Sequence, residues 1–195
     1  MAVGDIHACP EPLTELLQLA ESYPEHKLVF LGDYIDRGPD ANAVISILSE
    51  LDAIFIRGNH EQTLLDAMHT LEQEADEEWF LNWKNISRES YLWIKDQTRA
   101  SFVTEDYVFS HAGMDPDKQL EEQTDDDFFW SYHEEEYKNE SRTMVHGHIA
   151  GDSVRIVGNN INVDTGCGQD GFLSAIVLPE KKILTSRTRG FRTQH

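Results

Sequence analysis

The sequence has few basic residues, few cysteines and no long apolar run. Only 16 of its 195 residues are Lys or Arg, against 36 Asp or Glu, which gives a net charge of −20. Such a chain repels a phosphate backbone, so we expect no nucleic-acid partner. Two cysteines, Cys9 and Cys167, cannot form a disulfide framework, which favours a reducing compartment and a cytoplasmic location. No apolar run approaches the ~18 residues of a membrane span, so we expect no membrane partner.

The remaining pattern predicts one α/β domain over residues 1–195, without a linker or an internal repeat. In the first half, short apolar segments alternate with amphipathic ones, which indicates parallel strands joined by helical crossovers. From residue 101 onward, strand-like segments dominate, and we expect two sheets packed face to face with helices outside. The expected helices are 10–22, 39–51 and 61–71, and the expected strands are 1–3, 27–31, 53–56, 101–104, 107–110, 143–146, 154–157, 160–163, 172–178 and 182–187.

Residues 72–100 differ from the rest, because acidic residues are mixed with Trp79, Trp83 and Trp93 at roughly helical spacing. One interpretation is a helical insertion whose aromatic side chains pack on the core. The other is a lid or groove wall beside a functional site. We favour the first interpretation and keep the second open.

Residues that commonly bind metals follow the expected strands. Gly4-Asp5-Ile6-His7, Gly32-Asp33 and Gly58-Asn59-His60-Glu61 come directly after strands of the first half, and His111 and Gly147-His148 follow strands of the second half. Ligands of open α/β sheets bind beyond the carboxyl ends of the strands, so we expect these segments to converge. Carboxylate, amide and imidazole donors together suit manganese, iron or zinc.

The donors are too many for one ion, so we expect two divalent cations. Asp33, on the middle strand, can bridge both with one carboxylate. Two ions about 3.5–4 Å apart activate a shared hydroxide and neutralise a phosphoryl group during in-line displacement. The donors divide into Asp5 and His7 for the first ion, the bridging Asp33, and Asn59, His111 and His148 for the second ion.

Further polar residues beside these donors fit the same chemistry. Arg37 and Arg57 can present fork-like donors to phosphate oxygens. His60 directly follows Asn59, so it can protonate a leaving oxygen without binding a metal. Asp36 can orient that imidazole and favour its charged form.

These segments resemble the motifs of the metal-dependent phosphoprotein phosphatases, within the wider calcineurin-like metallophosphoesterases. That family carries GDxHG, GDxxDRG and GNHE, then an isolated His and a late GH, and the corresponding blocks occur here in order. The resemblance, which is greatest to small bacterial and phage members, implies a four-layer α/β/β/α sandwich and a manganese centre, with iron or zinc as alternatives. It implies metal ligands Asp5, His7, Asp33, Asn59, His111 and His148, catalytic residues His60 and Asp36, and phosphate-binding residues Arg37 and Arg57.

The sequence departs from the family pattern at two positions. Ala8 stands where the first motif has Gly, a mild change unless the backbone there needs a positive φ. Tyr132 stands where small members often carry a further phosphate-binding Arg, and we expect Arg142 or Arg88 to replace that clamp. His146, in the sequence His-Gly-His, either faces the site or packs in the core.

The motifs predict a phosphomonoesterase that acts as a monomer, by direct attack of a metal-bridging hydroxide on a phosphorylated Ser, Thr or Tyr side chain of a protein. The first alternative is a dinucleoside polyphosphate hydrolase, such as a diadenosine tetraphosphatase. The resemblance implies that this branch lacks the second acid of GDxxDRG and has Asp in place of Glu61, so Asp36 and Glu61 favour the protein phosphatase. A general phosphomonoesterase is a second alternative. A non-catalytic scaffold is disfavoured, because all metal ligands and His60 are present.

Overall fold

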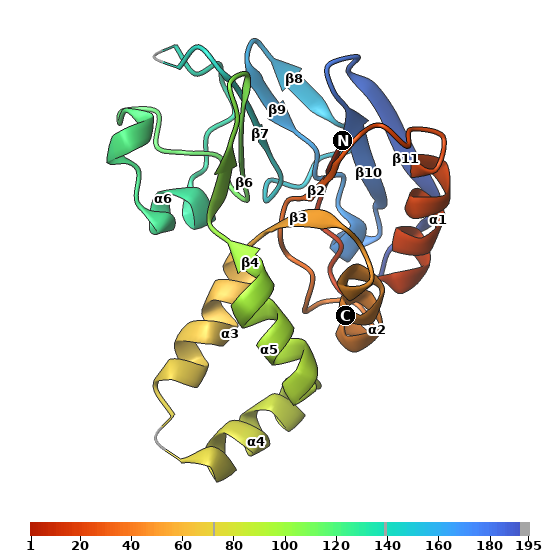
Figure 1. The fold of residues 1–195 in the computed structure, drawn as a ribbon, viewed down its shortest axis with the longest axis vertical. Coiled ribbons are helices and arrows are strands. Elements are labelled where there is room, and N and C mark those ends of the chain that lie inside the picture. Colours follow the sequence, from red (N-terminus) through yellow and green to blue (C-terminus); the bar gives the residue numbers. More distant parts are fainter. Residues whose placement is uncertain (72, 139, 192–195) are drawn as a thin grey trace.

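The computed structural model describes residues 1–71, 73–138 and 140–191. Glu72, the first residue of the expected insertion, and residues 139 and 192–195 of the expected domain lie outside the described residues. The described chain folds into two mixed sheets with helices on their outer faces (Figure 1). None of the helices in these ranges is both long enough and apolar enough to cross a membrane.

Six strands form the first sheet: β1 (Ala2–Val3), β2 (Leu28–Phe30), β3 (Ala53–Ile56), β4 (Thr98–Arg99), β10 (Phe172–Val177) and β11 (Lys182–Arg189). Their order is β11-β10-β1-β2-β3-β4. Strands β1 to β4 are parallel, whereas β10 and β11 are antiparallel to their neighbours. The carboxyl ends of β1, β2 and β3 therefore meet at one edge of the sheet.

Five strands form the second sheet: β5 (Ser101–Val103), β6 (Tyr107–Ser110), β7 (Thr143–His146), β8 (Arg155–Val157) and β9 (Asn160–Asn162). Their order is β5-β6-β7-β9-β8, with β6, β7 and β9 parallel at the centre. The carboxyl ends of β6 and β7 are therefore neighbours as well.

Alternation along the strands divides their side chains between two cores, because successive residues point to opposite faces of a sheet. The core between the sheets contains Ala2, Val29 and Ile54 from the first sheet and Val145 and Ile161 from the second. The next residues along the same three strands, Val3, Phe30 and Phe55, belong to the core beneath the helices.

The helices cover the two outer faces. The first sheet is covered by α1 (Pro10–Ala20), α2 (Ala41–Ser49), α3 (Asn59–His69) and α5 (Arg88–Gln97), and the second by the short α6 (Asp125–Trp130). Helix α2 begins where Asp40 accepts a hydrogen bond from Ala43 N at 2.9 Å, as an N-cap does. Single 3₁₀ turns lie at Leu120–Glu122 and Cys167–Gln169. The predicted four-layer α/β/β/α sandwich is confirmed.

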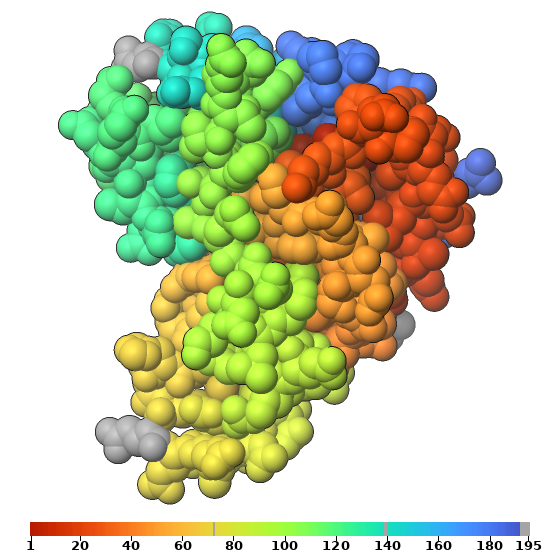
Figure 2. Space-filling model, viewed as in Figure 1, coloured from red at the N-terminus to blue at the C-terminus, as the bar shows by residue number. Residues whose placement is uncertain are grey.

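The segment after α3 forms an arm of two helices, α4 (Glu74–Trp83) and α5, which projects from the sandwich (yellow and green in Figure 2). Asn42 of α2 holds its base, with hydrogen bonds to Asn85 O at 3.0 Å and from Ser87 N at 2.9 Å. Trp93 packs on the core, 4.8 Å from the ring of Phe55. Trp79 and Trp83 are each 67% exposed. Only part of the expected aromatic packing is therefore present.

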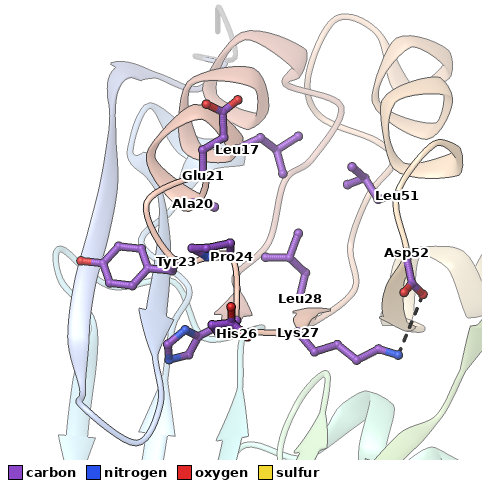
Figure 3. Close-up of a pocket in the computed structure, with 11 residues that line it drawn as sticks. Leu17, Ala20, Glu21, Tyr23, Pro24, His26, Lys27, Leu28, Leu51 and Asp52 are labelled. Atoms are coloured by element: carbon purple, nitrogen blue, oxygen red, sulfur yellow. Dashed lines mark ion pairs between the residues drawn. The ribbon is translucent and has the colours of Figure 1, made fainter.

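A cavity of about 530 Å³ lies at the amino ends of β2 and β3 (Figure 3). Leu17, Tyr23 and Leu28 are among its lining residues, and Lys27 and Asp52 form an ion pair of 3.9 Å beside it. This end of the sheet is opposite to the loops that carry the predicted metal donors, so the cavity is separate from them.

Candidate metal centre

Loops at the carboxyl ends of five strands bring the predicted metal donors together. The loops follow β1, β2 and β3 of the first sheet and β6 and β7 of the second. A hydrogen bond of 3.2 Å from His148 N to the Asp5 carboxylate joins loops of the two sheets. The residues placed in this cluster are Asp5, His7, Asp33, Asn59, His111 and His148. All six predicted donors are therefore neighbours in space.

Asp33 lies at the middle of the cluster. Its Oδ2 atom is 3.5 Å from His7 Nε2, and its Oδ1 atom is 3.5 Å from His111 Nε2. Ligand atoms of Asp5, Asp33 and His111 lie within 4.8 Å of one another, as do those of His7, Asp33 and His60. Each carboxylate oxygen thus faces a different group of donors, as a carboxylate that bridges two cations requires.

His111, Asn59 and His148 meet through atoms that carry lone pairs. His111 Nδ1 donates a hydrogen bond to Leu31 O at 2.9 Å, which leaves Nε2 of a neutral ring without a proton. This Nε2 atom lies 2.8 Å from Asn59 Oδ1 and 3.1 Å from His148 Nδ1. In this orientation the Asn59 amide oxygen faces only acceptors. With the amide reversed, its nitrogen would instead donate to His111 Nε2 at 2.8 Å. With the oxygen toward His111, the amide oxygen and the unprotonated Nε2 atom are both available as ligands, so this arrangement fits a metal ion.

Burial sets the charges of the cluster. It lowers the pKa of His111 to about 3 and that of His148 to about 4, so both imidazoles are neutral and able to bind a cation. Burial also raises the pKa of Asp33 to about 6. Burial and the charge of neighbouring Asp164 raise the pKa of Asp5 well above its usual range. Divalent cations stabilise carboxylates crowded in this way, so the donor set fits two such ions.

His60 lies at the edge of the cluster. Its Nδ1 atom is 2.7 Å from Asp36 Oδ2, and its Nε2 atom faces Asp33 Oδ2 at 3.8 Å. Burial opposes protonation, but the hydrogen bond and charge of Asp36 raise the pKa of His60. The other oxygen of Asp36 accepts a hydrogen bond from Lys84 Nζ at 2.6 Å. Against the effect of burial, the hydrogen bonds from His60 and Lys84 lower the pKa of Asp36 to about 2.

The two arginines expected to bind phosphate are placed differently. Arg37 is exposed, and its charge adds to the effect of burial in lowering the pKa of His7. Arg57 is half-buried and fixed by two neighbours. Its Nε atom donates to Thr98 Oγ1 at 2.9 Å, and its Nη1 atom donates to Gln62 Oε1 at 3.1 Å. Arg37 is thus within electrostatic reach of the cluster, while Arg57 is anchored on β4 and α3.

This geometry agrees with a comparison to known protein families. The family model for calcineurin-like phosphoesterases matches residues 1–170, which include every donor of the cluster. The chain belongs to this family. It is therefore a phosphoester hydrolase. Members of this family use a dinuclear divalent metal centre.

Relatives of this phosphoesterase differ in their activities. An asymmetrical bis(5'-nucleosyl)-tetraphosphatase of Oceanobacillus iheyensis is 27% identical over an alignment of 232 positions, which covers 96% of this chain and 91% of that protein. Serine/threonine-protein phosphatase 1 of Salmonella typhimurium is 40% identical over 81 residues, which cover 41% of this chain and 36% of that protein. A solved structure described as a candidate diadenosine tetraphosphatase shares the fold, with a TM-score of 0.71, 22% identity, and coverage of 98% of this chain and 93% of that one.

Glu61 holds two loops of the phosphoesterase centre in place. Its fully buried carboxylate accepts hydrogen bonds from the N–H groups of Asp33, Tyr34, Ile35 and Gly58 at 2.8–3.1 Å. Gly58 has no room for a side chain, because a Cβ atom there would lie 2.1 Å from Asp33 Oδ1. Glu61 therefore organises the backbone around the bridging carboxylate.

Backbone strain is concentrated in the loops of the site. Ala8 has φ of +54°, so the position where the family motif has Gly does adopt the left-handed conformation. That conformation costs a residue with a Cβ atom roughly 1–2 kcal/mol, so the replacement of Gly is not a mild change. The non-glycine residues at the site with positive φ are His7, Ala8, Asp33, Asp36, Arg37 and His148.

Lys84 is the cation that the helical arm supplies to the site, and the sequence analysis missed it. No motif marks this residue, because only the docking of the arm brings it to Asp36. The expectation that Arg142 or Arg88 replaces the missing clamp is wrong. Arg142 binds both carboxylate oxygens of Glu140 at 3.2 Å, and Arg88 pairs with Glu77 at 3.1 Å within the arm.

Two further residues have roles that their sequence context left open or did not show. His146 is fully buried, and its ring nitrogens lie 2.8 Å from Asn160 Oδ1 and 3.0 Å from Gly147 O, so it packs beneath the site. Asp164 lies close enough to Asp5 for its charge to raise the pKa of Asp5, and burial raises the pKa of Asp164 itself to about 6.

Proposed function

We propose that this phosphoesterase hydrolyses dinucleoside tetraphosphates such as diadenosine tetraphosphate. The observation that carries the proposal is the similarity to the Oceanobacillus iheyensis tetraphosphatase, which covers 96% of this chain. A match of that length includes both halves of the metal centre. The match to the Salmonella typhimurium protein phosphatase spans 81 residues, too few to hold both His7 and His148.

Asp36 and Glu61, which favoured a protein phosphatase, are poor guides to the substrate. Asp36 is bound to His60 and Lys84, and Glu61 is bound to backbone N–H groups. Both residues support a centre that any phosphoester substrate can use. The group beyond the phosphoryl centre lies outside their contacts, so they carry no information on whether it is a nucleoside or a peptide.

We further propose that Asp5, His7, Asp33, Asn59, His111 and His148 hold two divalent ions, with manganese as the first expectation. Such ions supply Lewis-acid polarisation of a phosphoryl group and a water of lowered pKa. Arg37 adds positive charge for the outer phosphate oxygens. His60 donates a proton or a hydrogen bond from Nε2 to the leaving oxygen, while Asp36 holds its Nδ1 atom.

A second candidate function is the hydrolysis of phosphorylated Ser, Thr or Tyr side chains. The observation in its favour is the 40% identity to the Salmonella typhimurium phosphatase over 41% of this chain. The two functions need the same centre and differ in what surrounds the phosphoryl group.

The proposed function is tested by incubating manganese-supplemented protein with diadenosine tetraphosphate and separating the nucleotide products by anion exchange. We expect each cleavage to give either one ATP and one AMP, in equal molar amounts, or two molecules of ADP. Asp33→Asn removes the bridging charge and should abolish both turnover and the binding of the second ion in calorimetry. An intact tetraphosphate beside rapid turnover of phosphopeptides would replace the proposal with the second candidate.

A further inference from the structure

An exposed tryptophan stands beside the metal centre. Trp130 is the last residue of α6 and is 52% exposed. Its ring centre lies 6.5 Å from that of the metal donor His148, with an angle of 89° between the two planes. Because the rings are perpendicular, His148 leaves at least one face of the indole uncovered. A large apolar face is thus open to water at the rim of a polar site.

The position of Trp130 is fixed by its neighbours. The preceding Phe129 is 1% exposed, and Phe128 is buried in the core under α6. The N–H group of Ala112, next to the donor His111, donates a hydrogen bond to Phe128 O at 2.8 Å. The helix is therefore tied to the metal-binding loop, and the indole is held in place before any ligand arrives.

A second exposed aromatic residue follows Trp130 two positions along the chain. Tyr132 is 74% exposed, and Ser131 between the two aromatic residues has extended backbone angles of −60° and 150°. We call these two exposed residues, Trp130 and Tyr132, the aromatic rim.

We propose that the aromatic rim binds the nucleobase of the nucleotide whose phosphate lies in the metal centre. The inference rests on the proposed function and names the group that makes a nucleotide a better substrate than a simple phosphate ester. One ribose joins the base to the phosphate, so a base stacked on Trp130 leaves its phosphate near His148. Stacking on an aromatic face accepts any base, because every base has a π face.

Acidic residues flank the rim in the sequence, at 125–127 and 134–136. Asp127 is paired with Lys118, and Glu134 with Arg155. The remaining carboxylates of these segments can accept hydrogen bonds from the N–H donors of a base. A neutral ring carries no charge for them to repel, so it suits this setting.

The test compares Trp130→Ala and Trp130→Phe with a control, Trp79→Ala, which removes a more exposed tryptophan (67%) from α4. Calorimetry measures the dissociation constants of AMP and of inorganic phosphate on the manganese-supplemented protein, and kinetics measure KM for diadenosine tetraphosphate. We expect Trp130→Ala to weaken AMP binding about 5- to 150-fold. Phosphate binding should be unchanged, Trp130→Phe should retain most of the affinity, and Trp79→Ala should have no effect.

Four outcomes overturn the inference. Equal weakening of AMP and phosphate would mean that Trp130 only supports the metal centre. Unchanged AMP binding in Trp130→Ala, with normal turnover of the tetraphosphate by the unmodified protein, would reject the rim but keep the proposed function. An effect of Trp130→Ala confined to phosphotyrosine peptides would assign the rim to a tyrosine ring. If the unmodified protein fails to cleave the tetraphosphate, the proposed function falls and the inference falls with it.

Discussion

Replacing His146 by Gln tests whether this buried histidine is a packing residue or a part of the metal centre. Burial lowers its pKa to about 4, and its Nε2 atom lies 2.8 Å from Asn160 Oδ1. Gln keeps a donor that can reach Asn160 but has no group that titrates in this range. We expect the variant to bind divalent ions like the unmodified protein, and to differ from it in how stability depends on pH.

The sign and size of that difference follow from the pKa of His146. An unfolded histidine has a pKa near 6.5, whereas the folded value is about 4. The folded state therefore resists protonation, and the contribution to stability is complete above pH 6.5 and is lost as the pH falls toward 4. Between pH 7.5 and pH 5.0 the linkage relation gives a loss of about 2 kcal/mol that His146→Gln does not suffer.

The assay is urea unfolding of the metal-free protein at both pH values. The free energy of unfolding of the unmodified protein should fall by about 2 kcal/mol more than that of His146→Gln. His69→Gln, at an exposed residue of α3, is the control and should follow the unmodified protein. Identical pH dependence of the unmodified protein and His146→Gln would refute the reasoning, and loss of metal binding in His146→Gln would place the residue in the centre.

Three further predictions concern the site. His60→Gln removes the proton donor and should lower kcat on a phosphoserine peptide about 10²–10⁴-fold. The loss of kcat on a tetraphosphate should be smaller, because its leaving group is a weaker base. Equal losses on the two substrates in steady-state kinetics would contradict this role. Lys84→Met leaves one oxygen of Asp36 without its hydrogen bond and should lower kcat by up to about tenfold. Lys84→Arg should retain activity. Equal rates for the two variants would show that the contact has no catalytic effect. Gly58→Ala places a Cβ atom 2.1 Å from Asp33 Oδ1 and should abolish metal binding in calorimetry, so an unchanged metal titration would refute the close packing.

The sequence was sufficient for those features that depend on local pattern. Short apolar strands ending in Gly and a polar donor predicted the parallel core and the loops at its edge. The joint position of Asp33 and His7 follows from this topology, because the carboxyl ends of the adjacent parallel strands β1 and β2 meet. His111 joins them from the second sheet, through the packing of the two sheets.

Features that depend on how distant segments dock could not be predicted in the same way. Lys84 reaches Asp36 only because Asn42 fixes the base of the helical arm. The strand β4 has two residues, too few for a periodic signal, and it exists through pairing with β3. The contact between Trp130 and His148 joins the last residue of α6 to the loop after β7.

The expected preference for a phosphoprotein shows a different limit. It rested on Asp36 and Glu61. In the structure, Asp36 contacts His60 and Lys84, and Glu61 accepts hydrogen bonds from backbone N–H groups of the centre. Residues that orient a general acid or a backbone loop are needed for any phosphoester. Substrate class depends on the surface around the centre. A single sequence contains the aromatic residues of that surface but does not show which of them are exposed at the site.

The most direct test of the account is a competition between substrates in one reaction. Manganese-supplemented protein is given diadenosine tetraphosphate together with a mixed set of phosphoserine, phosphothreonine and phosphotyrosine peptides, and the ratio of kcat/KM values is measured. We expect a clear preference for the tetraphosphate, which Trp130→Ala reduces. A preference for the peptides in the unmodified protein would contradict it.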